Sequence, residues 1–414
     1  MQKRPEIDEV FKPRNHEVND QIYVHRPDLE KSLELGLSGS LHTVKYGESG
    51  SGKSWLYKKI LQQRAANFVV VNGGNAARNK SITKEILSAI KPASVAKVVG
   101  YTEKGEAGLS VVGFQAKVDH QKSFVYDDLD PLFEAYSLLE NKSKSGVSYI
   151  VLDNLELVFN SSDLMDELAS ILTLLDDANY AKFHVRFLLV GTRREIRDYF
   201  QTTKNLPTVA NRLTSIPEVS NLNEQQVYDL VKRGFVDLLK VEIEKEFLNE
   251  WSQHVRRVTL GNPAAIHEYC AHLAFFVKED NWAPKSSHLA QADGAWLAGK
   301  LKPAYDNIET LLNEKHTELQ RRNQVLYSLT KLTNSTFDYV DVQNMVKAEF
   351  PSSTKGNMNI AQVLGELATK YINPVIKKSS TKGQGYEFTQ PYYLMALRAM
   401  LRKTNTEKVE KLDI

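Results

Sequence analysis

The sequence predicts an α/β fold built on a parallel β-sheet, followed by a helical region and a smaller C-terminal domain. Between about residues 22 and 216, helical patterns alternate with four short apolar runs, LHTVKY, NFVVVN, SYIVLDNLELVF and VRFLLVGT. Such runs are typical of parallel strands covered by helices on both faces. From residue 223 to about 278 the pattern is helical, and the last hundred residues predict three helices, a β-hairpin and a further helix.

Length and composition fit a globular protein of several domains. The chain has 414 residues, of which 42% are apolar and 25% charged. The predicted segments are an N-terminal arm at 1–20, an α/β core at 21–218, a helical region at 219–290, connecting helices at 291–317 and a C-terminal domain at 318–414. Within the core, the glycine-rich stretch VGYTEKGEAGLSVVGFQAKVDH predicts a β-hairpin insertion between the second and third strands.

Charge, cysteine content and hydropathy narrow the class of protein. Lys and Arg number 53 and Asp and Glu 51, so no global charge demands a nucleic-acid or membrane partner. One cysteine, Cys270, excludes an intramolecular disulfide framework and fits a reducing cytosol; it is either a buried apolar residue or a reactive thiol. The polar N-terminus and the lack of long apolar runs predict a cytoplasmic protein without a membrane partner.

The stretch GESGSGKS, residues 47–54, satisfies the pattern G-x-x-x-x-G-K-[ST] between an apolar strand and an amphipathic helix. Its glycines let backbone N–H groups approach a β-phosphate, Lys53 can reach the β- and γ-phosphates, and Ser54 can offer its hydroxyl to Mg²⁺. The alternative is a surface turn rich in Gly and Ser. The residues expected to contact ATP in this region are Gly47, Glu48, Ser49, Gly50, Ser51, Gly52, Lys53, Ser54 and Trp55.

A second strand supplies the acidic partner that such a loop needs. In SYIVLDNLE, four apolar residues end in Asp153, which is expected to hold Mg²⁺ together with Ser54; the alternative is an aspartate that caps a helix. Asn154 can orient a water molecule but cannot accept its proton, and Glu156 is the nearest carboxylate that could do so. The sequence therefore supports ATP binding better than fast hydrolysis.

With these motifs placed, the chain resembles the STAND and origin-recognition branches of the AAA+ ATPases from about residue 22 to the C-terminus. The resemblance implies a P-loop AAA+ core, an α-helical lid, a C-terminal winged helix, and ATP bound between core and lid. IYVHRPDLEKSL is similar to the motif hhGRxxE that precedes the loop in STAND proteins, with Arg26 in the arginine position and His25 where glycine is usual. The implied role of this segment is to cover the adenine.

Two further segments resemble family motifs near the γ-phosphate. VRFLLVGTRREI looks like the sensor 1 strand, which implies that Thr192 and Arg193 sense the γ-phosphate; the alternative is an ordinary strand with a polar cap. ANRLTSIPEVSNLNEQQVYDLV resembles the segment that leaves the core, a buried strand and then the first lid helix. Arg212 falls there where related proteins often carry an arginine finger that acts in trans; the alternative is a salt-bridge residue at a domain edge.

The lid carries the last family motif. VTLGNPAAIHEYC is similar to the GxP motif of STAND proteins, with Gly261 and Pro263 in the matching positions, and the resemblance implies that Pro263 packs near the adenine. Ala264 falls where origin-recognition ATPases carry a sensor 2 arginine, so this arginine is absent.

The predicted winged helix has two interpretations, contact with DNA and intramolecular switching. From Arg321 onward there are 14 Lys and Arg against 8 Asp and Glu, an excess that suits phosphate contacts. No arginine lies on the third helix to read guanine, so sequence-specific binding is not indicated. The polar residues of that helix and the wing are Lys355, Asn357, Asn359, Gln362, Lys370, Lys377, Lys378 and Lys382.

Three functions follow as hypotheses. The first is a nucleotide-gated switch with slow hydrolysis that acts on a protein partner, such as a signalling or phage-defence effector. The second is a DNA-binding AAA+ ATPase, a loader or transposition-type regulator, and the third is a P-loop kinase of small molecules. The family resemblance also implies a homo-oligomer in the ATP state.

Overall fold

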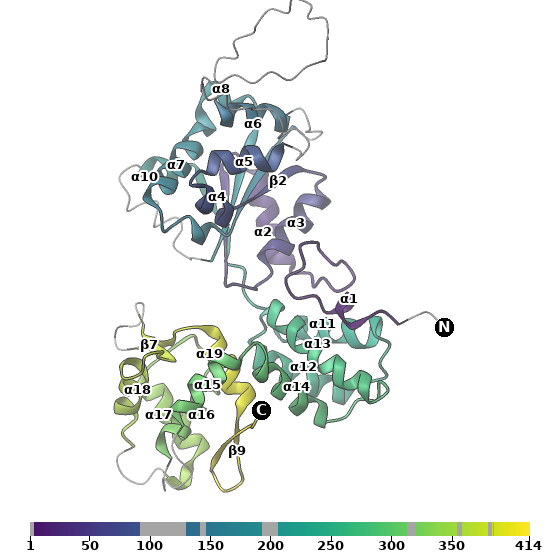
Figure 1. Ribbon diagram of the computed structural model, residues 1–414, viewed down its shortest axis with the longest axis vertical. Coiled ribbons are helices and arrows are strands. Elements are labelled where there is room, and N and C mark those ends of the chain that lie inside the picture. Colours follow the sequence, from purple (N-terminus) through teal and green to yellow (C-terminus); the bar gives the residue numbers. More distant parts are fainter. Residues whose placement is uncertain are drawn as a thin grey trace, which may run out of the picture. The chain divides into compact units, whose positions relative to one another are not determined.

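The computed structural model describes residues 4–91, 130–140, 146–192, 206–312, 320–353, 358–379, 383 and 385–414 (Figure 1). The chain divides into two compact units, Arg26–Ser220 and Met1–His25 with Asn221–Ile414. The hairpin predicted between the second and third strands lies outside the described residues. No helix in the described ranges is long and apolar enough to cross a membrane.

The unit Arg26–Ser220 is built on a five-stranded parallel sheet, in the order β2-β3-β4-β1-β5. The prediction of an α/β fold on a parallel sheet is therefore confirmed. The four long strands coincide with the four apolar runs, and the short fifth strand lies in the segment that leaves the core. The strands are β1 (His42–Tyr46), β2 (Asn67–Asn72), β3 (Ser148–Asp153), β4 (Val185–Gly191) and β5 (Leu213–Ser215).

Helices cover both faces of this sheet, which explains why its strands are apolar without alternation. Along β3, Tyr149 and Val151 pack with α2 (Pro27–Ser38) and α3 (Lys53–Gln63), which lie side by side (Figure 1). The alternate residues Ile150 and Leu152 pack in the other cluster. The helices that contribute to that second cluster are α4 (Gly73–Asn79), α5 (Ile82–Ile90), α6 (Pro131–Glu140) and α7 (Ser162–Thr173). The remaining short elements are η1 (Leu155–Leu157), η2 (Leu174–Asp176), α8 (Ala178–Ala181) and α10 (Leu206–Ala210).

The other unit begins with the N-terminal arm and continues as a group of helices. The short helix α1 (Ile7–Val10) is followed by Phe11, whose ring lies 5.2 Å from that of Phe235. Gly234 leaves room for this contact, since a Cβ there would approach the Phe11 ring to 2.3 Å. The helical elements are α11 (Glu224–Lys232), the π-helical segment η3 (Arg233–Leu238), α12 (Lys245–Thr259), α13 (Pro263–Glu279), α14 (Ser287–Ala298) and α15 (Lys302–Leu311).

The C-terminal part of this unit has the predicted three helices and hairpin. A short strand also lies between the first two helices, and the three strands form an antiparallel sheet in the order β6-β8-β7. A second hairpin, β9–β10, ends the chain. The elements are α16 (Arg321–Leu329), β6 (Thr336–Phe337), α17 (Tyr339–Glu349), η4 (Pro351–Ser353), α18 (Ile360–Thr369), β7 (Ile376–Lys378), β8 (Tyr386–Phe388), α19 (Pro391–Met400), β9 (Leu401–Lys403) and β10 (Val409–Lys411).

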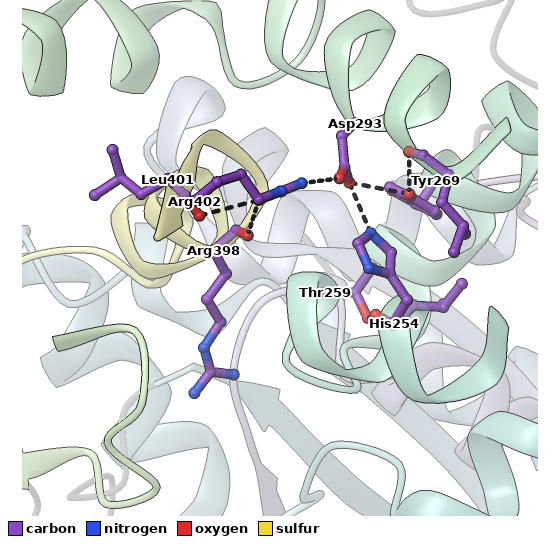
Figure 2. A network of polar contacts seen from close by, with 9 residues as sticks. His254, Thr259, Tyr269, Asp293, Arg398, Leu401 and Arg402 are labelled. Carbon is purple, nitrogen blue, oxygen red and sulfur yellow. Dashed lines mark hydrogen bonds and ion pairs between the residues drawn. The ribbon is translucent and has the colours of Figure 1, made fainter. Parts of the chain in front are cut away.

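A buried carboxylate joins the helical and C-terminal parts of this unit. Asp293 on α14 is 0% exposed and contacts three groups (Figure 2). His254 Nε2 on α12 lies 2.9 Å from its Oδ1, the Tyr269 hydroxyl on α13 donates to the same atom at 3.0 Å, and Arg402 on β9 forms an ion pair with Oδ2. Three consecutive helices and a strand that is distant in the sequence therefore meet at one charge.

We predict that Asp293→Ala lowers the free energy of unfolding of this unit by about 2 kcal/mol, because truncation removes the buried acceptor of His254, Tyr269 and Arg402. The loss is smaller than for a fully buried ion pair, since the Arg402 side chain is 41% exposed. Urea denaturation followed by tryptophan fluorescence measures the change. The control is Asp306→Ala, which removes the exposed ion pair with Lys302 and should cost less than ~0.5 kcal/mol. Equal, small losses in both variants would contradict the structural role of Asp293.

Candidate functional site

The phosphate loop, residues 47–54, connects β1 to α3 at the carboxyl edge of the sheet. Its turn requires glycine, because Gly50 and Gly52 have φ values of 80° and 87° in the left-handed region. Gly47 pairs with Val219, and a Cβ on it would approach the Val219 carbonyl oxygen to 2.7 Å. The helix α3 starts at Lys53, so its N-terminal N–H groups face the loop.

Asp153 ends β3 and lies against the start of α3. Its Oδ2 accepts hydrogen bonds from the Ser54 hydroxyl at 2.9 Å and the Tyr57 hydroxyl at 3.0 Å, and its Oδ1 accepts from the Asn154 N–H at 2.9 Å. Tyr57 was missed in the sequence, although its position three residues after Ser54 places both on one face of the helix. Burial, together with the Asp153 carboxylate, raises the pKa of Tyr57 above its usual value, so the phenol stays protonated.

Lys53 points back over the loop that precedes it. Its Nζ donates to the Gly47 carbonyl at 2.9 Å and to the Glu48 carbonyl at 2.8 Å. Burial lowers the pKa of this amine, while the carboxylates of Glu156 and Asp153 act in the opposite direction. These carboxylates are thus near enough to act on the same cation electrostatically.

The end of β4 joins the same edge. Thr192 follows Gly191, and its N–H donates to Glu156 Oε2 at 3.2 Å. Asn154 adopts a left-handed backbone with φ of 59°, and its carbonyl oxygen would lie 2.5 Å from a Cβ on Gly73. Gly73 therefore allows the chain after β2 to approach this turn, which the paired glycines of NGGN could have indicated. Arg193, expected beside Thr192, lies outside the described residues.

Arg26 lies behind the phosphate loop. Its side chain is 6% exposed, and its guanidinium donates to the carbonyls of Ser51 at 2.8 Å and Gly52 at 3.3 Å. Lys45 on β1 is fully buried nearby and donates to the Pro217 carbonyl at 3.0 Å. Burial and, to a smaller extent, the charge of Arg26 together lower the pKa of Lys45 to about 7. The sequence does carry a signal for Lys45, because a lysine inside an apolar strand is unusual, but the sequence analysis did not identify this buried amine.

Arg212 lies away from this edge. Arg212 precedes β5, and its carbonyl accepts from the N–H of His42 at the amino end of β1, the end opposite the phosphate loop. Its guanidinium forms an ion pair with Asp176, as the salt-bridge alternative proposed. Pro263 belongs to the other unit, where it is the first residue of α13 after the cap Asn262.

The remaining residues of the loop differ in exposure. Glu48 and Ser49 are exposed and Trp55 is half-buried, whereas Ser51 is 0% exposed. The Ser51 hydroxyl has no hydrogen-bond partner in the part of the chain that the structure describes.

The residues at this edge fit a nucleotide with Mg²⁺. A glycine-lined loop, a helix N-terminus and the Lys53 amine are groups that bind phosphate. Ser54 and Asp153 offer adjacent hard oxygens, and Mg²⁺ typically takes one or two such protein ligands and completes its shell with phosphate and water. Among the described residues there is no cluster of three or more His, Cys, Asp or Glu, the arrangement that a dedicated all-protein metal site would need.

Comparisons with known proteins agree with this geometry. A family model described as an AAA domain matches residues 37–200. A Walker-type ATPase of Pyrococcus abyssi has a similar structure, with a TM-score of 0.51 and 14% identity over 93% of this chain and 99% of that chain. The ORC2 protein of Aeropyrum pernix, in ADPNP–ADP complexes, gives a TM-score of 0.50 and 12% identity over 94% of this chain and 97% of its own. No curated protein sequence matches significantly.

The matched domain spans β1 to β4, the strands that carry the phosphate loop and Asp153. At these identities the structural similarity concerns the fold. Residues 37–200 are thus similar to an AAA domain, and the chain has the fold of an AAA+ P-loop ATPase.

Proposed function

We propose that this chain binds ATP with Mg²⁺ at the phosphate loop, hydrolyses it slowly, and uses the nucleotide state as a conformational switch. The observation that carries the proposal is the meeting of Lys53, Ser54, Asp153, Glu156 and Thr192 at one edge of the sheet. These groups come from the ends of β1, β3 and β4 and the turns that follow them. Positioned cations and oxygen ligands of this kind are the main requirement of phosphoryl transfer.

Each residue has a separate role in this proposal. Backbone N–H groups of the loop and the Lys53 amine bind the phosphates, which draw Lys53 away from the carbonyls of Gly47 and Glu48. Ser54 and Asp153 would hold Mg²⁺, which would neutralise negative charge on the phosphates. In this proposal Thr192, whose N–H is bound to Glu156, responds to the γ-phosphate.

Slow hydrolysis follows from the groups available to activate water. Asn154 cannot take a proton, so the general base falls to Glu156. One oxygen of Glu156 already accepts a hydrogen bond from the Thr192 N–H, so part of its hydrogen-bonding capacity is taken up by the protein. We infer that Glu156 contacts the attacking water and, through its hydrogen bond with Thr192, connects this water to the end of β4.

The switch interpretation is supported by the motif around Pro263. Gly261 has φ of 71°, and its carbonyl accepts from the Leu222 N–H at 2.8 Å, so the GxP-type turn is held against the segment that enters α11. Ala264 offers no cation for a γ-phosphate, as in STAND-type switches. ATP and ADP can favour different conformations only through their difference in affinity for them. We propose that a protein partner recognises the nucleotide-dependent conformation. We also propose that Arg212 acts on the nucleotide of a neighbouring copy in an ATP-dependent homo-oligomer.

Lys53→Ala should lower the affinity for MgATP about 100-fold or more, since a charged contact to phosphate is lost. Isothermal titration calorimetry measures the affinity, and circular dichroism verifies the fold. Lys59→Ala, on the same helix but beyond the loop, is the control and should bind as the unchanged chain does. Unaltered affinity in Lys53→Ala would place the nucleotide elsewhere.

Glu156→Gln should reduce single-turnover ATP hydrolysis by about 100-fold, as the loss of a general base does, while MgADP affinity stays the same. Radiolabelled ATP gives the rate and calorimetry the affinity. Asp163→Asn, an exposed change at the start of α7, is the control. Hydrolysis that survives in Glu156→Gln would exclude Glu156 as the base, and turnover of hundreds per minute without a partner would exclude a slow switch.

A DNA-binding function is the second candidate, supported by the C-terminal part. We infer a winged helix from the order helix, strand, helix, helix, strand, strand in residues 321–388. Lys377 and Lys378 on β7 are exposed, although Lys377 pairs with Glu387, and Lys370 on α18 pairs with Glu366. These carboxylates reduce the net charge available for phosphate contacts.

Fluorescence anisotropy with labelled duplex DNA and ATP tests this second candidate at low and physiological salt. A DNA-binding chain should lose affinity as salt rises, and Lys378→Ala should reduce the salt slope by about one counterion. Lys84→Ala in the α/β unit is the control. Absence of binding at both salt concentrations would exclude the DNA function.

A further inference from the structure

The strongest unexplained feature near the site is the buried guanidinium of Arg26. A residue that covers adenine would present its surface to the ligand, whereas Arg26 is 6% exposed and directed at the backbone of the phosphate loop. The bond to Ser51, at 2.8 Å, has the length of a charge-assisted hydrogen bond, which is stronger than a neutral one, and the bond to Gly52 is longer. Arg26 therefore acts on the loop itself.

The two carbonyls that Arg26 contacts belong to peptide planes that matter for phosphate binding. A carbonyl and the next N–H share one rigid plane, so Ser51 C=O fixes the direction of the Gly52 N–H, and Gly52 C=O fixes that of the Lys53 N–H. Donors that bind one end of a peptide polarise it and strengthen its other end. By binding the carbonyl ends of these two peptides, the guanidinium thus fixes the direction of two N–H groups at the start of α3.

Arg26 also lies at the two places where the chain passes from one unit to the other. The units divide between His25 and Arg26 and between Ser220 and Asn221. Arg26 Nη1 donates to the Ser220 carbonyl at 3.4 Å, besides its bond to Ser51. Val219, the residue before Ser220, also contacts the strand that leads into the loop, because its N–H donates to the Tyr46 carbonyl at 2.8 Å.

We propose that Arg26 is a positioning residue that aligns the loop peptides for a nucleotide phosphate and links phosphate occupancy to the order of both chain connections. This inference rests on the proposed nucleotide binding. When a phosphate accepts hydrogen bonds from the N–H groups of Gly52 and Lys53, it polarises their peptides. The carbonyls at the other ends of these peptides then bind Arg26 more strongly. Through Ser220 and its own backbone, the same guanidinium restrains residues 25–26 and 219–221. Because such coupling is reciprocal, disorder in these connections weakens phosphate binding in turn.

The test uses the full chain with MgADP as the probe, which avoids turnover. Calorimetry gives the affinity, and hydrogen–deuterium exchange reports on peptides covering 20–28, 47–54 and 216–224. The variants are Arg26→Gln, which removes the charge and the fork, and Arg26→Lys, which keeps the charge but cannot span three carbonyls. The matched control is Arg398→Gln, since Arg398 donates to the backbone carbonyls of Thr330, Arg257 and Leu332 in the other unit.

The expected affinity of Arg26→Gln is about 10- to 100-fold lower, the range for lost hydrogen bonds to a charged group. Arg26→Lys should lie between this variant and the unchanged chain, and Arg398→Gln should bind normally. In the unchanged chain, MgADP should slow exchange in all three peptides. At saturating MgADP, Arg26→Gln should keep protection at 47–54 and lose it at 20–28 and 216–224. If Arg26→Gln fails to fold by circular dichroism, Arg26→Lys decides the question by the same readouts.

Two different failures can be told apart. If the unchanged chain shows no protection at 47–54 with MgADP, the proposed function fails and the inference fails with it. If the chain binds MgADP and Lys53→Ala does not, but the Arg26 variants bind normally or still protect 216–224, only the inference is overturned.

Discussion

The parallel pairing of β4 with both β1 and β3 is the constraint on which the site depends. Parallel strands end at the same edge, so the turns after β1, β3 and β4 are brought together although about a hundred residues separate the first two. Lys53 and Ser54 come from the first turn, Asp153 and Glu156 from the second, and Thr192 from the third. The order of the strands in the sheet thus determines which residues meet at the site, and the loop glycines determine only the conformation of the turn after β1.

The fold and part of the site could be predicted because their signals are local. Apolar runs mark the buried strands, and the spacing of Gly47, Gly52 and Lys53 marks the loop. Asp153 could be placed because it ends such a run. The contact between Tyr57 and Asp153 depends on which strand packs against α3, so the sequence alone did not reveal it. The terminal hairpin β9–β10 was also missed, since three-residue strands give too short a pattern to read.

Buried charges were the hardest features to predict. A polar residue within an apolar pattern does not show whether it is exposed or paired, because its partners come from distant segments. Asp293 pairs with Arg402 from 109 residues away, and Arg26 contacts Ser220 across 194 residues. In both cases a buried ionic group makes several hydrogen bonds, which offset part of the cost of burying its charge. One network joins helices within a unit, and the other joins the phosphate loop to the segments that leave its unit.

The backbone after Asp153 gives a physical reason for the asparagine at a position where fast ATPases usually carry glutamate. Asn154 has φ of 59°, and asparagine adopts this left-handed conformation more readily than glutamate does. Its carbonyl lies close to Gly73, where a larger residue would force the turn to move. The turn after β3 is thus tightly held, and the next carboxylate falls two residues later at Glu156. A glutamate at position 154 would have to strain this backbone or change the turn, so the choice of Asn154 and the placement of Glu156 are two consequences of one turn geometry.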